Sequence, residues 1–95
     1  MDDEKKIHIV TESGFEWDFD EDVGDDQELL DALVEVDKNP GGYTKAIKMM
    51  MGEDGKAALY EHLRNEKGRV PATKVAQAIG EIMKLLGEAS KQVKN

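Results

Sequence analysis

The sequence has 95 residues, the length of one small domain, and we expect a single domain over residues 1–95. It carries 21 acidic and 13 basic side chains, a formal net charge of −8 at pH 7, and no cysteine. The lack of cysteine excludes a disulfide framework, cysteine-ligated metal sites and a thiol nucleophile. No apolar run approaches the roughly 18 residues of a membrane span, and no apolar stretch of a signal peptide follows the charged N-terminus. We therefore expect a soluble, cytosolic protein.

Residues 5–20 predict a β-hairpin. The segment 6–11 is rich in β-branched residues, and the segment 15–20 alternates strictly between aromatic and acidic side chains, which is typical of a half-buried strand. Gly14 can supply the tight turn between them. The aromatic residues then share one face: Phe15, Trp17 and Phe19. Because a two-stranded hairpin alone is barely stable in water, we expect helices to cover this face.

Residues 25–93 predict a helical part with about four helices. The expected ranges are 25–37, 43–51, 54–66 and 71–93, separated by a loop at 39–42, by Gly52 and by Gly68. The first helix should bury one apolar stripe of Leu29, Leu30, Leu33, Val34 and Val36. The predicted fold class is thus α+β, mainly α, with an N-terminal β-hairpin packed against about four helices and a long C-terminal helix.

The last helix carries apolar residues spaced alternately four and three apart. They are Val75, Ile79, Ile82, Leu86, Ala89 and Val93. This spacing is a heptad seam, but it extends over fewer than three heptads, which is too short to assert a coiled coil. The seam predicts either a core-facing stripe or an interface between copies of the chain, so a homo-oligomer remains open.

Three consecutive methionines, Met49 to Met51, close the second predicted helix. Methionine packs adaptably and suits surfaces that meet changing partners. Met50 and Met51 fit the buried stripe of their helix, which leaves Met49 nearer the surface; the alternative to a plain core is a partner-facing apolar edge. The candidate partner-binding residues are Met49, Met51, Ile79, Ile82, Met83 and Leu86.

No set of residues predicts catalysis. His8 and His62 lie in a predicted strand and helix, and neither Ser13 nor Ser90 sits in a nucleophile-elbow pattern. We therefore predict no enzymatic activity and no cofactor.

Asp18, Asp20 and Asp22 occupy positions 1, 3 and 5 of a calcium loop. Val23 and Leu29 stand where that loop requires glycine and glutamate, and a strand rather than a helix precedes it. We therefore predict no dedicated metal site.

The order of elements resembles the tail assembly chaperones of long-tailed, siphovirus-type bacteriophages and prophages of Gram-positive bacteria. The stretches that carry the resemblance are Phe15–Asp20, Gln27–Glu35, Lys45–Gly52, Leu59–Leu63, Lys67–Val70 and Ile79–Ile82. They cover nearly the whole chain. Their motifs are hydrophobic patterns with a few glycines rather than a chemical signature.

The resemblance implies a non-enzymatic protein of the bacterial host's cytoplasm that is absent from the mature virion. Members of that family bind the tape measure protein, a long, helical and hydrophobic chain. They keep it soluble until tail tube subunits polymerise around it, which makes the major tail protein a second candidate partner. Many are also made as a longer product by ribosomal frameshifting, and the C-terminal Lys94-Asn95 is compatible with a slippery codon run. No nucleic acid and no membrane are expected as partners.

The uneven charge supports a different class of function. Residues 1–42 contain 15 acidic residues and three lysines, a net of −12, whereas residues 67–95 contain six basic and two acidic residues. The alternative is an acidic inhibitor that mimics DNA and blocks a basic protein. The basic last helix is evidence against this alternative. The charge pattern is also expected if the charged residues only form the solvated faces of a soluble protein. Salt dependence separates the hypotheses, because a DNA mimic loses its partner steeply as ionic strength rises.

Overall fold

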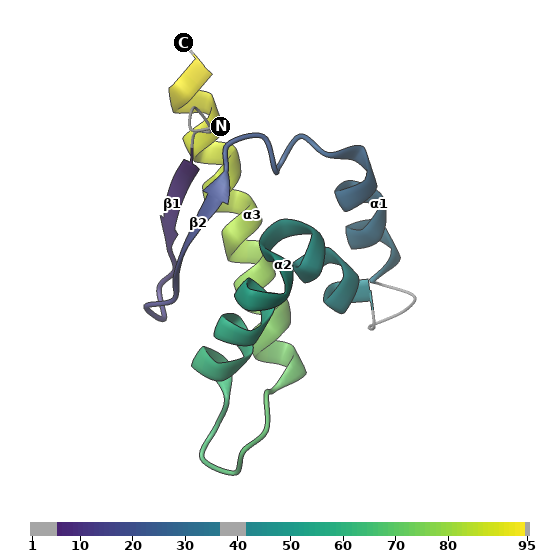
Figure 1. Cartoon of the computed structure of the whole chain (residues 1–95), viewed down its shortest axis with the longest axis vertical. Helices are drawn as coiled ribbons and strands as arrows, with labels where there is room; N and C mark the ends of the chain where they lie inside the picture. Colours follow the sequence, from purple (N-terminus) through teal and green to yellow (C-terminus); the bar gives the residue numbers. More distant parts are fainter. Residues whose placement is uncertain (1–5, 37–41, 95) are drawn as a thin grey trace.

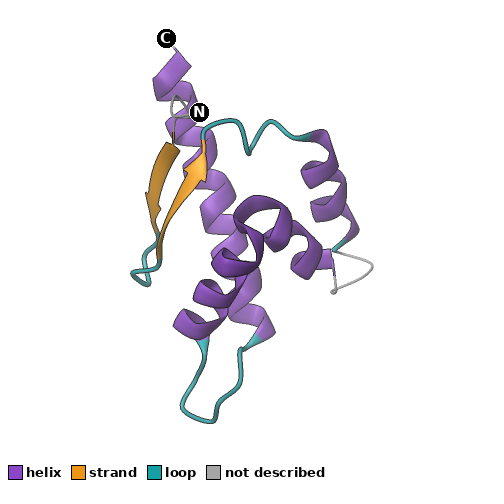
Figure 2. Cartoon of the chain, in the orientation of Figure 1, coloured by secondary structure: helices purple, strands orange, loops and turns teal. Residues whose placement is uncertain are grey.

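The computed structural model describes residues 6–36 and 42–94, with side chains up to Ala89, and shows a β-hairpin and three helices over these residues (Figure 2). The elements are β1 (Lys6–Val10), β2 (Glu16–Asp20), α1 (Gln27–Glu35), α2 (Gly42–Leu63) and α3 (Ala72–Lys94). In Figure 1 the long helix α3 runs behind both the hairpin and α2. Helix α1 lies beyond α2, on the side away from the hairpin, and packs against α2.

The hairpin confirms the prediction for residues 5–20. Its strands are antiparallel and pair Ile7 with Phe19 and Ile9 with Trp17. Gly14 adopts a φ of +94° in the turn, a conformation that costs glycine little. The aromatic face packs against α2 and α3, and Phe19 keeps only 1% of its surface exposed. Helices therefore cover this face, as the marginal stability of a lone hairpin requires.

Helix α1 begins at a capping aspartate. The Asp26 carboxylate accepts hydrogen bonds from the main-chain N–H groups of Glu28 (3.0 Å) and Leu29 (3.4 Å), which satisfies two amides that a helix start leaves unpaired. Leu29 is buried on the side of α2, but Leu30 and Val34 are 40% and 70% exposed. The prediction of a single buried stripe is thus wrong for these two residues. These two residues form a second line along the helix, and α2 covers only the line that contains Leu29.

The prediction of about four helices is wrong, because the two segments expected as separate helices, 43–51 and 54–66, form the single element α2. Gly52 lies inside α2 with φ 74° and ψ −176°, so one non-helical residue kinks the helix without a loop. Glycine was a correct signal for a local break and a helix was expected to follow it, but the sequence did not show that the two segments form one kinked element. Of the predicted loop at 39–42, residues 39–41 lie outside the described residues, and Gly42 is the first residue of α2 rather than part of a loop.

The core lies where α2 and the hairpin meet α3. Its largest fully buried side chains come from four elements: Phe19, Leu29, Ile47, Leu59 and Ile82. The seam of α3 belongs to this core, since Val75, Ile79, Ile82 and Leu86 keep 7% or less of their surface exposed. Ala89 is half-buried, and the side chain of Val93 lies outside the described part. The heptad spacing thus reflects packing within the monomer.

Candidate protein-binding surfaces

The structure places most of the predicted partner-binding residues inside the molecule. Met51, Ile79, Ile82 and Leu86 are buried, with exposures of 7%, 2%, 0% and 3%. Met49 and Met83 are half-buried and pack against the same core. The four buried residues are therefore core side chains rather than members of a surface patch. A period of 3.5 residues identifies the apolar side of a helix, but it does not distinguish the monomer's own core from another molecule.

Helix α1 carries an exposed apolar pair. Leu30 and Val34 are one turn apart on its outer side, and together with Val10 they are the large hydrophobic residues exposed in the described ranges. The acidic Asp31 and Glu35, which follow each of them in the sequence, are also exposed. An apolar i, i+4 pair on the uncovered side of a helix is the pattern by which helices bind one another. The sequence held a signal for this exposed pair, because the helical period places Leu30 and Val34 on a different line of the helix from Leu29.

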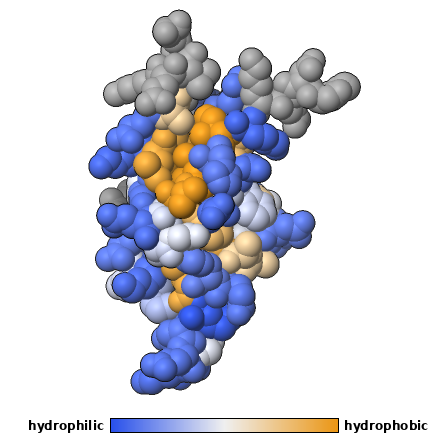
Figure 3. All heavy atoms as spheres, turned by 90° about the vertical axis from the view of Figure 1, so that its left-hand side faces the viewer, coloured by the Kyte–Doolittle hydropathy of each residue, from blue (hydrophilic) through white to orange (hydrophobic). Residues whose placement is uncertain are grey.

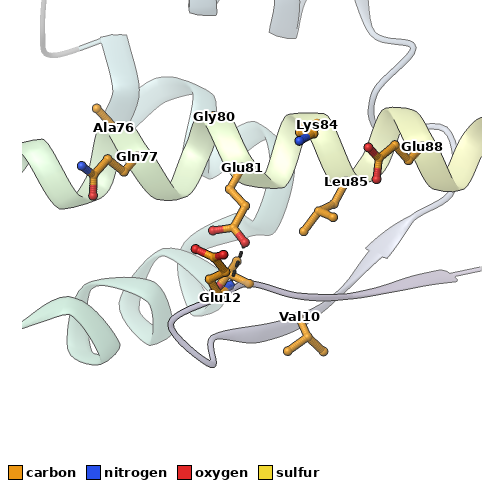
Figure 4. Close-up of a pocket in the computed structure, with 10 residues that line it drawn as sticks. Val10, Glu12, Ala76, Gln77, Gly80, Glu81, Lys84, Leu85 and Glu88 are labelled. Atoms are coloured by element: carbon orange, nitrogen blue, oxygen red, sulfur yellow. Dashed lines mark hydrogen bonds between the residues drawn. The ribbon is translucent and has the colours of Figure 1, made fainter.

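A second candidate surface is a groove between β1 and α3, with a volume of about 910 Å³. Its strand side includes Val10 and Glu12, and its helix side includes Gly80, Glu81, Leu85 and Glu88. Figure 4 shows Glu81 and Leu85 projecting from α3 toward the strand, whereas the Val10 side chain points away from the helix. The main-chain N–H of Glu12 donates to Oε2 of Glu81 at 2.7 Å. This contact holds the end of the strand against the helix.

The polar face of the hairpin pairs carboxylates with cations. His8 lies between Asp18 (2.5 Å from Nδ1) and Glu16 (3.1 Å from Nε2), and Lys6 Nζ lies 2.6 Å from Asp20 Oδ1. The hydrogen bond to Asp18 is the main cause that raises the pKa of His8 above 6.5, with a further contribution from Glu16. The described residues hold no group of three or more histidine, aspartate or glutamate side chains placed to bind a metal ion. Asp18 and Asp20 each have a partner on this face, in His8 and Lys6.

Ser13 and His62 meet although 49 residues separate them, and no sequence pattern predicted this contact. The Ser13 Oγ lies 3.1 Å from His62 Nε2, and the same nitrogen lies 3.2 Å from the Ser13 carbonyl oxygen. The carbonyl oxygen can only accept, so it is hydrogen-bonded in the tautomer that carries the proton on Nε2. A general base for the serine would need this nitrogen unprotonated. The contact instead joins the hairpin turn to the end of α2, where the His62 ring packs against Phe15 with ring centres 5.7 Å apart.

No family model matches the chain, and neither the curated proteins nor the solved structures contain a match. Within residues 6–36 and 42–94, no helix has the length and apolar character needed to cross a bilayer. The resemblance to tail assembly chaperones therefore stays a prediction. The surfaces described above are the features that bear on it.

Proposed function

We propose that this chain is a phage tail assembly chaperone that binds and solubilises the tape measure protein during tail morphogenesis, without catalysis. The observation that supports this function best is the exposed pair Leu30 and Val34 on α1. A helical client presents apolar anchors three and four residues apart, and such anchors fit beside an i, i+4 pair on another helix. The proposed binding surface is therefore this pair and not the seam of α3, whose residues are buried in the core.

The surroundings of the pair favour a client of defined character. α1 packs against α2 on one side, so its outer side is open to a second helix. Glu28, Asp31 and Glu35 are exposed on the same helix. Carboxylates beside an apolar line favour a client helix whose own apolar line is flanked by basic residues. Because full burial of one such side chain contributes about 1.5–3 kcal/mol, a single contact is weak, and a long client gains from many copies bound along it.

Co-expression tests the proposal directly. The client is the very long, helix-rich protein encoded beside this chain in its genome, and the readout is the fraction of that protein in the soluble extract. The double variant Leu30→Asp, Val34→Asp should lose the solubilising effect. A matched control, Ala72→Asp with Thr73→Asp, adds the same two charges at exposed positions of α3 and should behave as the parent chain. Circular dichroism verifies that both variants fold.

Two outcomes would contradict the proposal. If the folded Leu30→Asp, Val34→Asp variant still keeps the client soluble, α1 is not the binding surface. If the complex instead dissociates steeply between roughly 50 and 200 mM salt, charge rather than apolar contact holds it, as expected of a DNA mimic. The cations beside the hairpin carboxylates, Lys6 and His8, make the second outcome the less expected one.

A further inference from the structure

The strand β1 has one neighbouring strand, β2, so its second edge is free of strand pairing among the described residues. The Thr11 N–H donates to the Phe15 carbonyl oxygen at 2.9 Å. In an antiparallel ladder, main-chain groups alternate between the partner strand and the opposite side. The groups of residues 7, 9 and 11 therefore point toward β2, and those of residues 8 and 10 point to the free edge. An edge of this kind is a template for an additional strand.

The end of this free edge is bonded to α3, which lies over the side of β1 opposite to the Val10 side chain. The next outward-pointing N–H after Val10 is that of Glu12, and it donates to the Glu81 carboxylate of α3 at 2.7 Å. A side chain of the helix thus holds one position of the edge, and the groove runs along α3 beside Val10, the residue of β1 that lines it (Figure 4). An extended peptide that lies between a strand edge and a helix binds through main-chain hydrogen bonds on one side and side-chain contacts on the other.

The groove has the dimensions of one short strand. Its lining on α3 extends from Ala76 to Glu88, which at 1.5 Å per residue is about 18 Å. A strand of five or six residues at about 3.3 Å per residue has the same length. The volume of about 910 Å³ is open to solvent along this length. Figure 3 shows the molecule from the hairpin side, with an apolar area bordered by polar atoms.

The side chains around the groove define the character of its occupant. Glu12, Glu81 and Glu88 contribute three carboxylates, against the single ammonium group of Lys84. Leu85, which is half-buried, supplies an apolar contact on the helix side. The excess of carboxylates favours basic side chains on the side of α3, and the exposed Val10, whose side chain points to the opposite side, favours apolar ones there. A strand that alternates basic and apolar residues offers both, because successive side chains point to opposite sides.

We propose that the groove between β1 and α3 binds an extended segment of a partner polypeptide, with alternating basic and apolar residues, as a third strand of the sheet. This site is separate from the α1 pair, since it involves none of the residues of that helix. It therefore adds a second mode of binding, by main-chain pairing, to the helix-to-helix contact proposed for α1.

A designed peptide tests this site on the full chain. The probe is acetyl-Lys-Val-Lys-Val-Lys-Val-amide, and the readouts are its dissociation constant by calorimetry and the amide NMR shifts of β1 and α3. We expect binding with shifts confined to these two elements, and at least tenfold weaker binding of the peptide in which glutamate replaces lysine. Two further peptides carry N-methyl groups on alternate amides. One peptide is methylated at the amides of its lysines, and the other at the amides of its valines. Only one of them should lose binding, because only one set of amides faces β1. Equal affinities of these two peptides would overturn the proposal.

Two glycines of α3 provide a matched pair of variants. Gly80 lines the groove, Gly87 does not, and an added Cβ meets nothing within 4 Å at either position. Gly80→Leu places a side chain in the groove and should weaken peptide binding at least tenfold, whereas Gly87→Leu should leave it unchanged. Equal binding by both variants would refute the site. If the parent chain forms a dimer that Gly80→Leu dissociates and that the peptide leaves intact, the occupant of the groove is a second copy of this chain and not the proposed partner.

Discussion

Replacing Gly55 with alanine tests how closely α2 is packed around this residue, against Met51 of the same helix and Trp17 of the hairpin. Gly55 is buried in α2, three residues after the kink, and the Trp17 ring lies over it. A Cβ at this position would lie 2.1 Å from the Met51 Cβ and 3.1 Å from the Trp17 Cε2. Non-bonded carbon atoms prefer separations of about 3.5–4.0 Å. Alanine therefore requires a shift of the helix backbone, since a Cβ atom cannot rotate away.

The magnitude follows from two opposing terms. Alanine is about 1 kcal/mol more favourable than glycine inside a helix. Overpacking costs about 1–3 kcal/mol, and the short distance to the Met51 Cβ places Gly55→Ala at the upper end of that range. We expect a net loss of about 2 kcal/mol in the free energy of unfolding. For a domain of this size, the loss lowers Tm by roughly 8–16 °C.

The same substitution at Gly80 is the control, and thermal unfolding followed by circular dichroism is the assay. A Cβ at Gly80 meets no atom within 4 Å, so only the gain in helix propensity remains. Gly80→Ala should raise Tm by roughly 2–8 °C, from about 0.5–1 kcal/mol. The two substitutions thus have opposite signs. If Gly55→Ala also stabilises the chain, Met51 and Trp17 do not approach Gly55 as closely as described, and the packing of α2 is wrong at this point.

Three further predictions concern single contacts. Ile82→Ala removes a side chain with 0% exposure and should cost about 2–5 kcal/mol in urea unfolding, a large loss that a residue serving only as a partner contact would not show. The raised pKa of His8 means that its protonated form stabilises the fold: this contribution is complete below pH 6.5 and is lost as pH rises through the raised pKa. An NMR titration should find the His8 pKa above 6.5 and nearer that value in Asp18→Asn; an unchanged pKa in the variant would contradict the pairing. Ser13→Ala removes one hydrogen bond to His62 and should lower stability by about 0.5–1.5 kcal/mol, whereas no loss would show that the contact is absent in solution.

The sequence predicted the elements whose signals are local and consistent. The alternation around Trp17 and the glycine at position 14 specify the hairpin, because both the period and the turn chemistry point to one structure. The number of helices was wrong because a glycine marks a break without telling whether it separates two helices or kinks a single one. Gly52 leaves helical geometry for one residue, and the packing of Ile47 and Leu59 in one core holds both halves of α2 together.

The candidate sites depended on tertiary contacts that a periodic pattern does not contain. The pattern identified Ile79 and Ile82 as apolar, but only the position of the hairpin and α2 decides that they are covered. Leu30 and Val34 are exposed for the converse reason, since α2 is the element that packs against α1 among those the structure describes. The groove was beyond prediction, because it arises where the free edge of β1 meets a helix that begins more than 60 residues later in the chain.

Under the proposed function, the client-binding surface consists of two exposed side chains, which suits a chaperone that must release its client. In the free chain, Val34 is 70% exposed and Leu30 is 40% exposed. Burying these exposed fractions against a client gives a binding free energy of up to about 2–3 kcal/mol, which is too little to hold one copy for long. Polymerising tail tube subunits could then displace each copy in turn. A whole open α3 seam would add several large side chains and hold the client much more tightly. Under the proposed function, the burial of that seam therefore limits the affinity for the client while it stabilises the fold, and many weak contacts along a long client supply the remaining affinity.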